Sequence, residues 1–598
     1  MTPTPSTNSL VEALQQRWRG KAQFVVLEGA FDLGLRFLQT WAAWRNDPQR
    51  PQRLFFLSQQ EQLPASAELL QAHAAGSLAP LAAQLAEQWP PSVRGWHRLD
   101  FEGPALQLLV AVGPAQESLS QWQAQVDAFL LNDPAPKLED LQPLSRLAAA
   151  GSLLFSAHDG LPLRSTLRQA GFECCETGSQ GAIAFALRHI PRSPAGRQPL
   201  APEAREAIVL GAGLAGAACA RALHAAGLEV RVFDAAPQAA SQASGNPAGL
   251  FHGTLHLDDG PHARWNRSAA LRTRQWLGLY PPLWCVDGLL RLSPGEALST
   301  RQQLALAQQL DPAFAEPLDA TGATTRAGMA LQDGAWLYPG GGALSPRDWV
   351  LRLLEGLPLQ TETQVAAVQP LPGGRWQLLD RQGQALAETA LLVLAAGQHL
   401  PALLAPLDED LAAWLQPQRG QLSWWLSAAN GPRLPIASGG YVLQAPQGPA
   451  LVAGASADLH DDDPQLRDAD QSRNHAVAER LLGRALPAPD GGRVGWRLLA
   501  PDKLPLVGGL IDPAQAQPHR ATQVSAWARR PGLLVCGAMA SRGISWAALA
   551  AELLVAQALG WPVPVPRNLQ DALDPARLQV RKLRQGSSGQ SSRPVSPS

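Results

Sequence analysis

Three glycines and an acid give the clearest chemical signal in the chain. A short apolar run leads into Gly211-x-Gly213-x-x-Gly216, an alanine-rich stretch follows, and a second apolar run ends at Asp234. In a strand, turn, helix and strand of this kind, the glycines let backbone N–H groups reach a pyrophosphate at the positive end of the helix. The terminal acid accepts hydrogen bonds from ribose hydroxyls. The sequence therefore predicts a dinucleotide-binding site well inside the chain.

Small residues recur downstream, at places where a backbone would pass close to a bound dinucleotide. Residues 243–246 read ASGN, the apolar run LLVLAAG spans 391–397, and residues 533–552 read as a strand, a Gly/Ser/Arg turn and a helix. The candidates for cofactor contact in these segments are Ser244, Asn246, Gly397 and Gly543. Each segment alone also fits an ordinary turn or a buried strand, so the prediction depends on their combination.

Arg497 is the candidate for substrate binding. It follows Trp496 and precedes the apolar stretch that contains Lys503. A guanidinium is planar, stays protonated and matches both oxygens of a carboxylate, so we assign Arg497 to a substrate carboxylate. A structural ion pair is the alternative.

The composition describes a multidomain protein with balanced charge. A chain of 598 residues exceeds one ordinary hydrophobic core, and 46% hydrophobic with 17% charged residues is typical of globular proteins. The net charge of -1 excludes a diffuse cationic surface for nucleic acid, so contact with RNA needs a local patch. The candidate patch is Arg577, Arg581, Lys582 and Arg584, with an ordinary solvated charge run as the alternative.

Cysteine spacing and apolar runs exclude other classes. The five cysteines include no C-x-x-C pair, so neither a zinc site nor a disulfide framework is expected, and we predict no metal. No charged-then-apolar leader opens the chain, and charges interrupt the apolar runs before they reach membrane-spanning length. We therefore expect a cytoplasmic protein without membrane contact, acting as a monomer.

Two domains are expected to position these residues. Between residues 20 and 190, apolar strand-like runs alternate with helical stretches such as Ser66 to Gln88, which predicts an α/β domain over residues 1–190. Residues 191–204 are rich in proline and read as a linker. A second domain of strands and helices is expected over 205–584, and a disordered polar tail over 585–598.

The second domain resembles the amino-acid-oxidase superfamily of FAD enzymes and, within it, the family of bifunctional tRNA 5-methylaminomethyl-2-thiouridine biosynthesis proteins. The resemblance covers nearly all of residues 205–584. Its motifs are ASGN at 243–246, PGGGALSPRDW at 339–349, RGQ at 419–421, GASADLHDDDPQLRDADQSRN at 454–474, LPLVG at 504–508, SRGI at 541–544 and DPARLQVRKLRQG at 574–586. The implied fold is a Rossmann-type FAD-binding oxidoreductase with an α+β substrate domain.

The resemblance implies a reaction on tRNA. With FAD, this half of the family oxidises the carbon–nitrogen bond of a carboxymethylaminomethyl group on the wobble uridine, which releases glyoxylate and leaves an aminomethyl base. Arg497 would bind the glycyl carboxylate, and on resemblance alone Arg542 would lie near flavin and substrate. The residues expected on FAD are Gly211, Gly213, Gly216, Asp234, Ser244, Asn246, Gly397 and Gly543.

The first domain is expected to keep the fold of its relatives but not their site. In the family this half is a Rossmann-like methyltransferase that uses S-adenosylmethionine. Here Ala30, Asp32 and Leu33 replace the Gly, Gly and Thr of the donor-binding loop, while Glu28 and Gly34 remain. The lost glycines put side chains where the donor must approach backbone.

Other positions of this site have changed as well. Gln60 stands where the second strand should end in an acid, and Pro114 replaces an acid near the adenine. Asn132 and Asp133 replace an Asp-Gly pair at the catalytic edge. We therefore expect a degenerate methyltransferase site, marked by Glu28, Gly34, Gln60 and Asn132, and impaired methylation.

Two other functions fit parts of the sequence. The flavin motifs do not name the macromolecule, so an oxidase of free glycine or D-amino acids is one alternative, although the segment 454–474 and the terminal basic run favour tRNA. A non-catalytic tRNA-binding protein is the other. The intact fingerprint, Arg497 and Arg542 argue against it.

Overall fold

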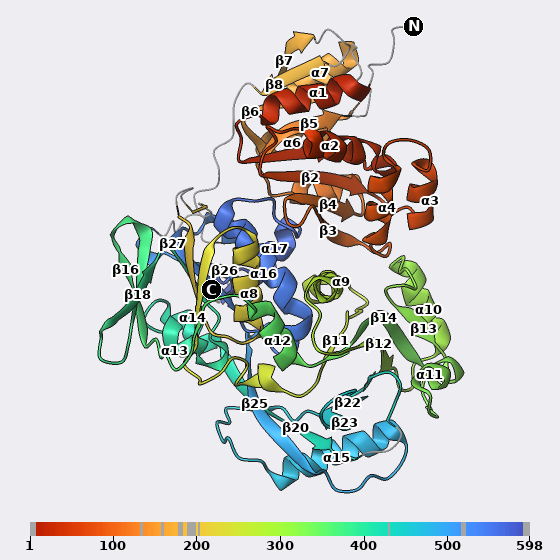
Figure 1. Ribbon diagram of the computed structural model, residues 1–598, viewed down its shortest axis with the longest axis vertical. Coiled ribbons are helices and arrows are strands. Elements are labelled where there is room, and N and C mark those ends of the chain that lie inside the picture. The colour runs from red at the N-terminus through yellow and green to blue at the C-terminus, as the bar shows by residue number, and fades with distance from the viewer. Residues whose placement is uncertain are drawn as a thin grey trace, which may run out of the picture. The chain divides into compact units, whose positions relative to one another are not determined.

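Two units make up the chain, of which the computed structural model describes residues 7–131, 136–156, 161–177, 183–187, 199–200, 204–427, 431–515 and 522–589 (Figure 1). The first unit comprises Met1–Ser193 and Gly560–Asn568, and the second comprises Pro194–Leu559 and Leu569–Ser598. Residues 560–568, which the sequence predicts to be in the second domain, pack with the first unit.

An eight-stranded sheet organises the first unit, in the order β3-β4-β2-β1-β5-β6-β8-β7. Strands β4, β2, β1, β5 and β6 are parallel, and antiparallel strands complete both edges. The strands are β1 (Gln23–Glu28), β2 (Arg53–Gln60), β3 (Gly95–Phe101), β4 (Leu106–Val112), β5 (Val126–Leu131), β6 (Ala148–Ser156), β7 (Phe172–Thr177) and β8 (Ile183–Leu187). This doubly wound order, which reverses between β1 and β5, confirms the predicted Rossmann-like fold.

Helices and aromatic rings cover this sheet. The helices are α1 (Thr7–Trp18), α2 (Leu35–Asn46), α3 (Ser66–Ala72), α4 (Ala79–Glu87), α5 (Ala115–Gln121), α6 (Leu138–Leu147) and α7 (Leu161–Gln169). Phe37 of α2 is fully buried, and its ring centroid lies 5.4 Å from that of Phe56 on β2 and 5.7 Å from that of Phe101 on β3. Burying one such ring stabilises the fold by about 1.5–3 kcal/mol.

The returning segment Gly560–Asn568 is anchored by Trp561. Its ring centroid lies 5.5 Å from that of Phe55, and the Arg53 guanidinium lies 4.5 Å from the same ring. The backbone N of Val563 donates to the carbonyl oxygen of Gln123 at 3.0 Å. A tryptophan with a cation–π partner thus ties residues distant in sequence to the first unit.

One predicted helix is wrong in its extent. Ser66 to Gln88 forms two helices, α3 and α4, rather than one. The break contains Gly76, whose φ of +122° is incompatible with a continuing helix.

A six-stranded sheet forms the cofactor-binding part of the second unit, in the order β15-β10-β9-β19-β27-β26. All its pairs are parallel except β26 with β27. The strands are β9 (Glu206–Leu210), β10 (Glu229–Phe233), β15 (Leu359–Gln360), β19 (Leu391–Leu394), β26 (Leu506–Ile511) and β27 (Arg529–Gly537). The buried residues Ile208, Leu392 and Val535 contribute to its core.

A ten-stranded mixed sheet forms the second part of this unit, and a three-stranded sheet of β16 (Ala367–Leu371), β17 (Arg375–Leu379) and β18 (Ala385–Thr389) stands beside the cofactor part (Figure 1). The larger sheet contains β11 (Gly249–Phe251), β12 (Cys285–Leu292), β13 (Glu316–Leu318), β14 (Ala335–Leu344), β20 (Gln416–Trp425), β21 (Ile436–Ala437), β22 (Tyr441–Gln444), β23 (Leu451–Gly454), β24 (Asp458–Leu459) and β25 (Gly491–Leu499). Together they give the predicted Rossmann-type and α+β parts.

Eleven helices of the second unit surround these sheets in the described chain. They are α8 (Leu214–Ala225), α9 (Pro261–Leu279), α10 (Leu298–Ala307), α11 (Ala320–Ala327), α12 (Pro346–Leu354), α13 (Leu400–Leu404), α14 (Glu409–Trp414), α15 (Asp468–Leu482), α16 (Gly543–Leu559), α17 (Arg567–Leu573), which begins in the returning segment, and α18 (Ala576–Gly589). Helix α18 takes in the first residues of the expected tail. Among the helices described, none has the length and apolarity needed to cross a membrane.

Candidate functional site

The glycine turn lies between β9 and α8 and has the close packing that its residues predict. Gly211 has a φ of +108°, and a Cβ on Gly216 would lie 1.8 Å from the Gly211 carbonyl oxygen. The Asp234 carboxylate follows β10 and accepts hydrogen bonds from the backbone N of Ala212 at 2.6 Å and of Ala236 at 2.8 Å. The acid therefore lies beside the turn, at the edge where a dinucleotide would bind.

A cavity of about 1060 Å³ opens at this edge. Its lining contains all the residues expected on FAD except Gly216, which packs beneath the turn, and it also contains Arg497 and Arg542. Ser244 Oγ accepts from the backbone N of Leu214 at the start of α8, at 3.0 Å. The volume, the backbone N–H groups of the turn and the absence of space for a side chain at Gly216 fit a large dinucleotide such as FAD.

Arg497 projects into this cavity from β25. Its partner across the ladder is Gln418 of β20, whose Oε1 accepts from Arg497 Nη1 at 3.4 Å. A Cβ on Gly420, two residues further along β20 on the same face, would lie 2.8 Å from Arg497 Nη2, so glycine leaves room there for the guanidinium to lie across the strand. Burial lowers the pKa of Arg497, and neighbouring Tyr441 opposes this shift. No carboxylate forms an ion pair with Arg497 within the described residues, which disfavours the structural alternative.

Arg542 and His252 also line the cavity. Arg542 immediately precedes α16, and burial, with repulsion from Arg291, lowers its pKa to about 10. Burial, together with repulsion from Arg542, lowers the pKa of His252 to about 3. His252 is therefore neutral at physiological pH. No motif in the sequence marked this histidine, because its place follows only from the packing of β11 against α16.

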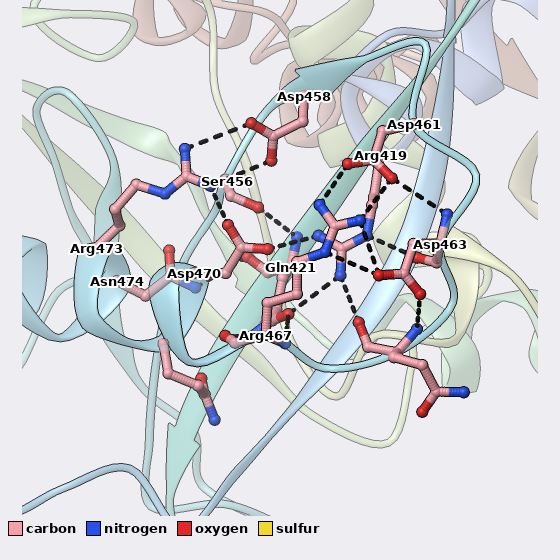
Figure 2. A network of polar contacts seen from close by, with 12 residues as sticks. Arg419, Gln421, Ser456, Asp458, Asp461, Asp463, Arg467, Asp470, Arg473 and Asn474 are labelled. Carbon is pink, nitrogen blue, oxygen red and sulfur yellow. Dashed lines mark hydrogen bonds and ion pairs between the residues drawn. The ribbon is translucent and has the colours of Figure 1, made fainter.

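A polar network lies on the face of β20 opposite Arg497 (Figure 2). Side chains alternate along a strand, so Gly420 faces Arg497 while Arg419 and Gln421 face away. Arg419 and Asp470 are fully buried and form an ion pair at 2.5 Å. Arg419 Nε also donates to the carbonyl oxygen of Asp463 at 2.7 Å.

Arg467 and Gln421 complete the network. The Gln421 amide accepts from the backbone N of Arg467 at 2.9 Å and donates to its carbonyl oxygen at 3.1 Å. The Arg467 guanidinium forms ion pairs with Asp461 and Asp463 (Figure 2). The RGQ motif and the acidic segment after it thus fix one loop against the strand that supports Arg497.

The C-terminal basic run makes contacts within the chain. Arg577 donates to both carboxylate oxygens of Asp502 at 2.9 Å, and Arg581 donates to the same carboxylate at 3.1 Å. Lys582 pairs with Asp410 at 2.8 Å, and Arg584 donates to the carbonyl oxygen of Thr522 at 2.6 Å. These contacts favour a structural role for the run over the predicted phosphate contacts.

The methyltransferase-type residues of the first unit gather at the carboxyl ends of parallel strands. Glu28 ends β1 and is buried, with Oε1 3.7 Å from Arg36 Nε, and Gln60 ends β2. Asp32 and Leu33 have φ of +40° and +55°, and Gly34 has +77°. The backbone of Asp32 and Leu33, two non-glycine residues, thus has a left-handed conformation, which costs about 1–2 kcal/mol for each residue.

Two further expectations concern Asn132 and a metal site. Asn132 does not fall within the described residues. Within those residues, the structure has no group of three or more His, Cys, Asp or Glu side chains that could hold a metal ion.

Comparisons with known proteins found similar families and structures. Residues 206–557 match the family model described as FAD dependent oxidoreductase. A tRNA 5-methylaminomethyl-2-thiouridine biosynthesis bifunctional protein from Methylibium petroleiphilum is 40% identical and covers 96% of this chain and 93% of its own. One of the same name from Aromatoleum aromaticum is 36% identical and covers 96% of this chain and 92% of its own. Glycine oxidase from Geobacillus kaustophilus is similar in structure over 60% of this chain and 94% of its own, with 20% identity and a TM-score of 0.48.

Proposed function

The chain belongs to the FAD dependent oxidoreductase family and to the family of tRNA 5-methylaminomethyl-2-thiouridine biosynthesis bifunctional proteins, and from this membership we propose that its second unit acts on the wobble uridine of tRNA. The proposed substrate is a 5-carboxymethylaminomethyl group, with or without 2-thiolation of the uracil. Two electrons and two protons leave its glycyl methylene and amine, and water hydrolyses the resulting imine to glyoxylate and an aminomethyl base.

The main support is the position of Arg497. A guanidinium that is half-buried, lies in the same cavity as the glycine turn and has no carboxylate partner in the described chain is suited to a substrate carboxylate. Clamping the glycyl carboxylate there would fix the distance and angle of the methylene carbon.

The remaining residues would hold the cofactor and surround the reacting bond. FAD, when bound, supplies the two-electron acceptor. The turn from Gly211 to Gly216 would receive its pyrophosphate and Asp234 its ribose, with Ser244, Asn246, Gly397 and Gly543 along its length. Arg542 would lie near flavin and substrate, beside the neutral His252.

For the first unit we propose a methyltransferase fold without a working donor site. The left-handed Asp32 and Leu33 and the exchange of acids at Gln60 and Pro114 support this proposal. Isothermal titration of the full chain with S-adenosylmethionine is expected to show no saturable heat, and micromolar binding would overturn it. We also propose that the enzyme is cytoplasmic, and that it is monomeric because one chain supplies every residue assigned to the cavity.

One experiment separates the candidate functions. The holoenzyme is incubated with tRNA bearing the carboxymethylaminomethyl base, with and without S-adenosylmethionine, and the nucleosides are analysed by mass spectrometry. Aminomethyl product in both samples is expected. Methylaminomethyl product in the presence of the donor would restore a working methyltransferase, and unchanged tRNA beside rapid oxidation of free glycine would contradict the tRNA assignment.

A further inference from the structure

Lys503 occupies a tight turn directly after the strand that carries Arg497. The backbone N of Lys503 donates to the carbonyl oxygen of Ala500 at 2.9 Å, and Lys503 has a left-handed φ of +59°. The preceding Asp502 accepts from the backbone N of Leu504 at 3.2 Å and is fixed by the bidentate contact of Arg577. The lysine is therefore exposed on a rigid support, and within the described residues its ammonium forms no ion pair.

The turn follows a residue that lines the cavity and is bonded to the segment before Arg542. Leu498, which lines the cavity, accepts through its carbonyl oxygen from the backbone N of Ala540 at 3.0 Å. Arg542 follows Ala540 by two residues. The turn that contains Lys503 begins two residues after Leu498. The two cations thus extend from neighbouring, hydrogen-bonded segments.

Two histidines lie against the same region. Asn266 Nδ2 donates to the carbonyl oxygen of His262 at 2.8 Å, and Trp546 Nε1 donates to Asn266 Oδ1 at 2.9 Å. The Trp546 backbone N in turn donates to the Arg542 carbonyl oxygen at 3.0 Å, which places His262 beside the Arg542 turn. The His256 ring centroid lies 5.6 Å from that of His262.

The positive charges of Lys503 and Arg542 act on the two histidines, and the nearby carboxylates do not neutralise them. Burial, together with repulsion from Arg542, His256 and Lys503, lowers the pKa of His262 to about 4. The nearby acids are engaged or turned to solvent: Asp259 pairs with Arg267 at 2.7 Å, and Asp258 is exposed in the same loop as His256. An anion that entered here would be attracted by at least two permanent cations.

We propose that Lys503, with His256 and His262 and in the electric field of Arg542, here together called the cationic cluster, binds the RNA backbone phosphate next to the nucleotide whose base enters the cavity. The inference rests on the proposed function, because that function brings a polynucleotide to this cavity. A base that reaches a buried cofactor has to leave its stack, and a phosphate contact at the entrance would fix the sugar-phosphate backbone while it does so. The balanced net charge requires such a contact to be local.

Lys503→Ala tests this proposal, with Lys582→Ala as the matched control. Both variants remove one exposed lysine, but Lys582 is paired with Asp410 and lies outside the cationic cluster. Binding of an unmodified anticodon stem-loop RNA to the holoenzyme is measured by fluorescence anisotropy over a range of salt concentrations. Lys503→Ala is expected to weaken binding about tenfold and to reduce the slope of log K against log salt by about 0.7. Lys582→Ala and Lys503→Arg should behave like the parent protein.

A second measurement separates this proposal from the proposed function. The Lys503→Ala holoenzyme should oxidise the free carboxymethylaminomethyl nucleoside at the parent rate while losing about tenfold in kcat/KM on tRNA. Unchanged RNA binding and salt slope in Lys503→Ala, or an equal loss in Lys582→Ala, would overturn the phosphate contact. The binding assay needs no turnover, so an enzyme inactive on tRNA would contradict the proposed function alone.

Discussion

Gly420→Ala tests how the position of Arg497 depends on the strand beneath it. A Cβ at this position would lie 2.8 Å from Nη2 and 3.0 Å from Cζ of Arg497, and 3.0 Å from the carbonyl oxygen of Ser456. The Nη2 distance is about 0.6 Å short of ordinary van der Waals contact at 3.4 Å. Because the Ser456 oxygen belongs to the backbone and gives little, the guanidinium has to move.

The displacement should weaken the contact between Arg497 and the substrate carboxylate. A hydrogen bond to a charged group contributes about 1.5–3 kcal/mol, so losing most of this contact corresponds to a fall in kcat/KM of about tenfold to hundredfold. Steady-state oxidation of the carboxymethylaminomethyl nucleoside measures this fall, and the flavin absorbance reports whether FAD is retained.

Gly278→Ala is the control for this variant. Gly278 lies in α9, and nothing lies within 4 Å of the Cβ it would gain. Normal kinetics are expected there. Unchanged kcat/KM in Gly420→Ala with full flavin content would refute the placement of Arg497 on the substrate, and loss of flavin would show that Gly420 supports the cofactor instead.

Three further variants probe the cavity and its support. Arg497→Ala should lose substrate oxidation but stay yellow, which absorbance and turnover assays check together. Gly216→Ala would place a Cβ 1.8 Å from the Gly211 carbonyl oxygen, so the purified protein should be colourless, and a yellow variant would contradict the packing of the turn. Arg419→Met leaves the buried Asp470 with only the exposed Arg473 as partner and should destabilise the second unit by up to about 3–5 kcal/mol in denaturant unfolding. Burial raises the pKa of Asp470, but hydrogen bonds from Arg419 and Arg473 outweigh it and leave that pKa below 3.8. The stability from this pair is therefore complete above the unfolded pKa and is lost on acidification, a dependence that Arg419→Met should flatten.

Local patterns made much of the cofactor site predictable. The spacing of Gly211, Gly213 and Gly216 reflects backbone contacts within one strand, turn and helix, so the sequence of that unit is sufficient. Arg497 could also be identified as a candidate from the sequence, because a guanidinium inside an apolar stretch requires an anionic partner. Its assigned role stays a prediction.

Features that depend on contacts between residues distant in sequence could not be predicted from the sequence. His252 carries no local signature, and its neutral state arises from burial and from Arg542, which follows 290 residues later. The terminal basic run looked available for phosphate, yet Asp502 and Asp410 engage it from other parts of the chain. The return of Gly560–Asn568 to the first unit likewise depends on the Trp561 contacts with β2.

The most direct test of the central claim is anaerobic reduction of the flavin by the proposed substrate. The yellow holoenzyme is mixed without oxygen with tRNA bearing the carboxymethylaminomethyl base, and flavin absorbance, glyoxylate and nucleosides are measured in the same sample. The account predicts rapid bleaching, with glyoxylate and aminomethyl base formed in equal amounts to the flavin reduced. Flavin that stays oxidised with this tRNA but bleaches with free glycine would contradict it.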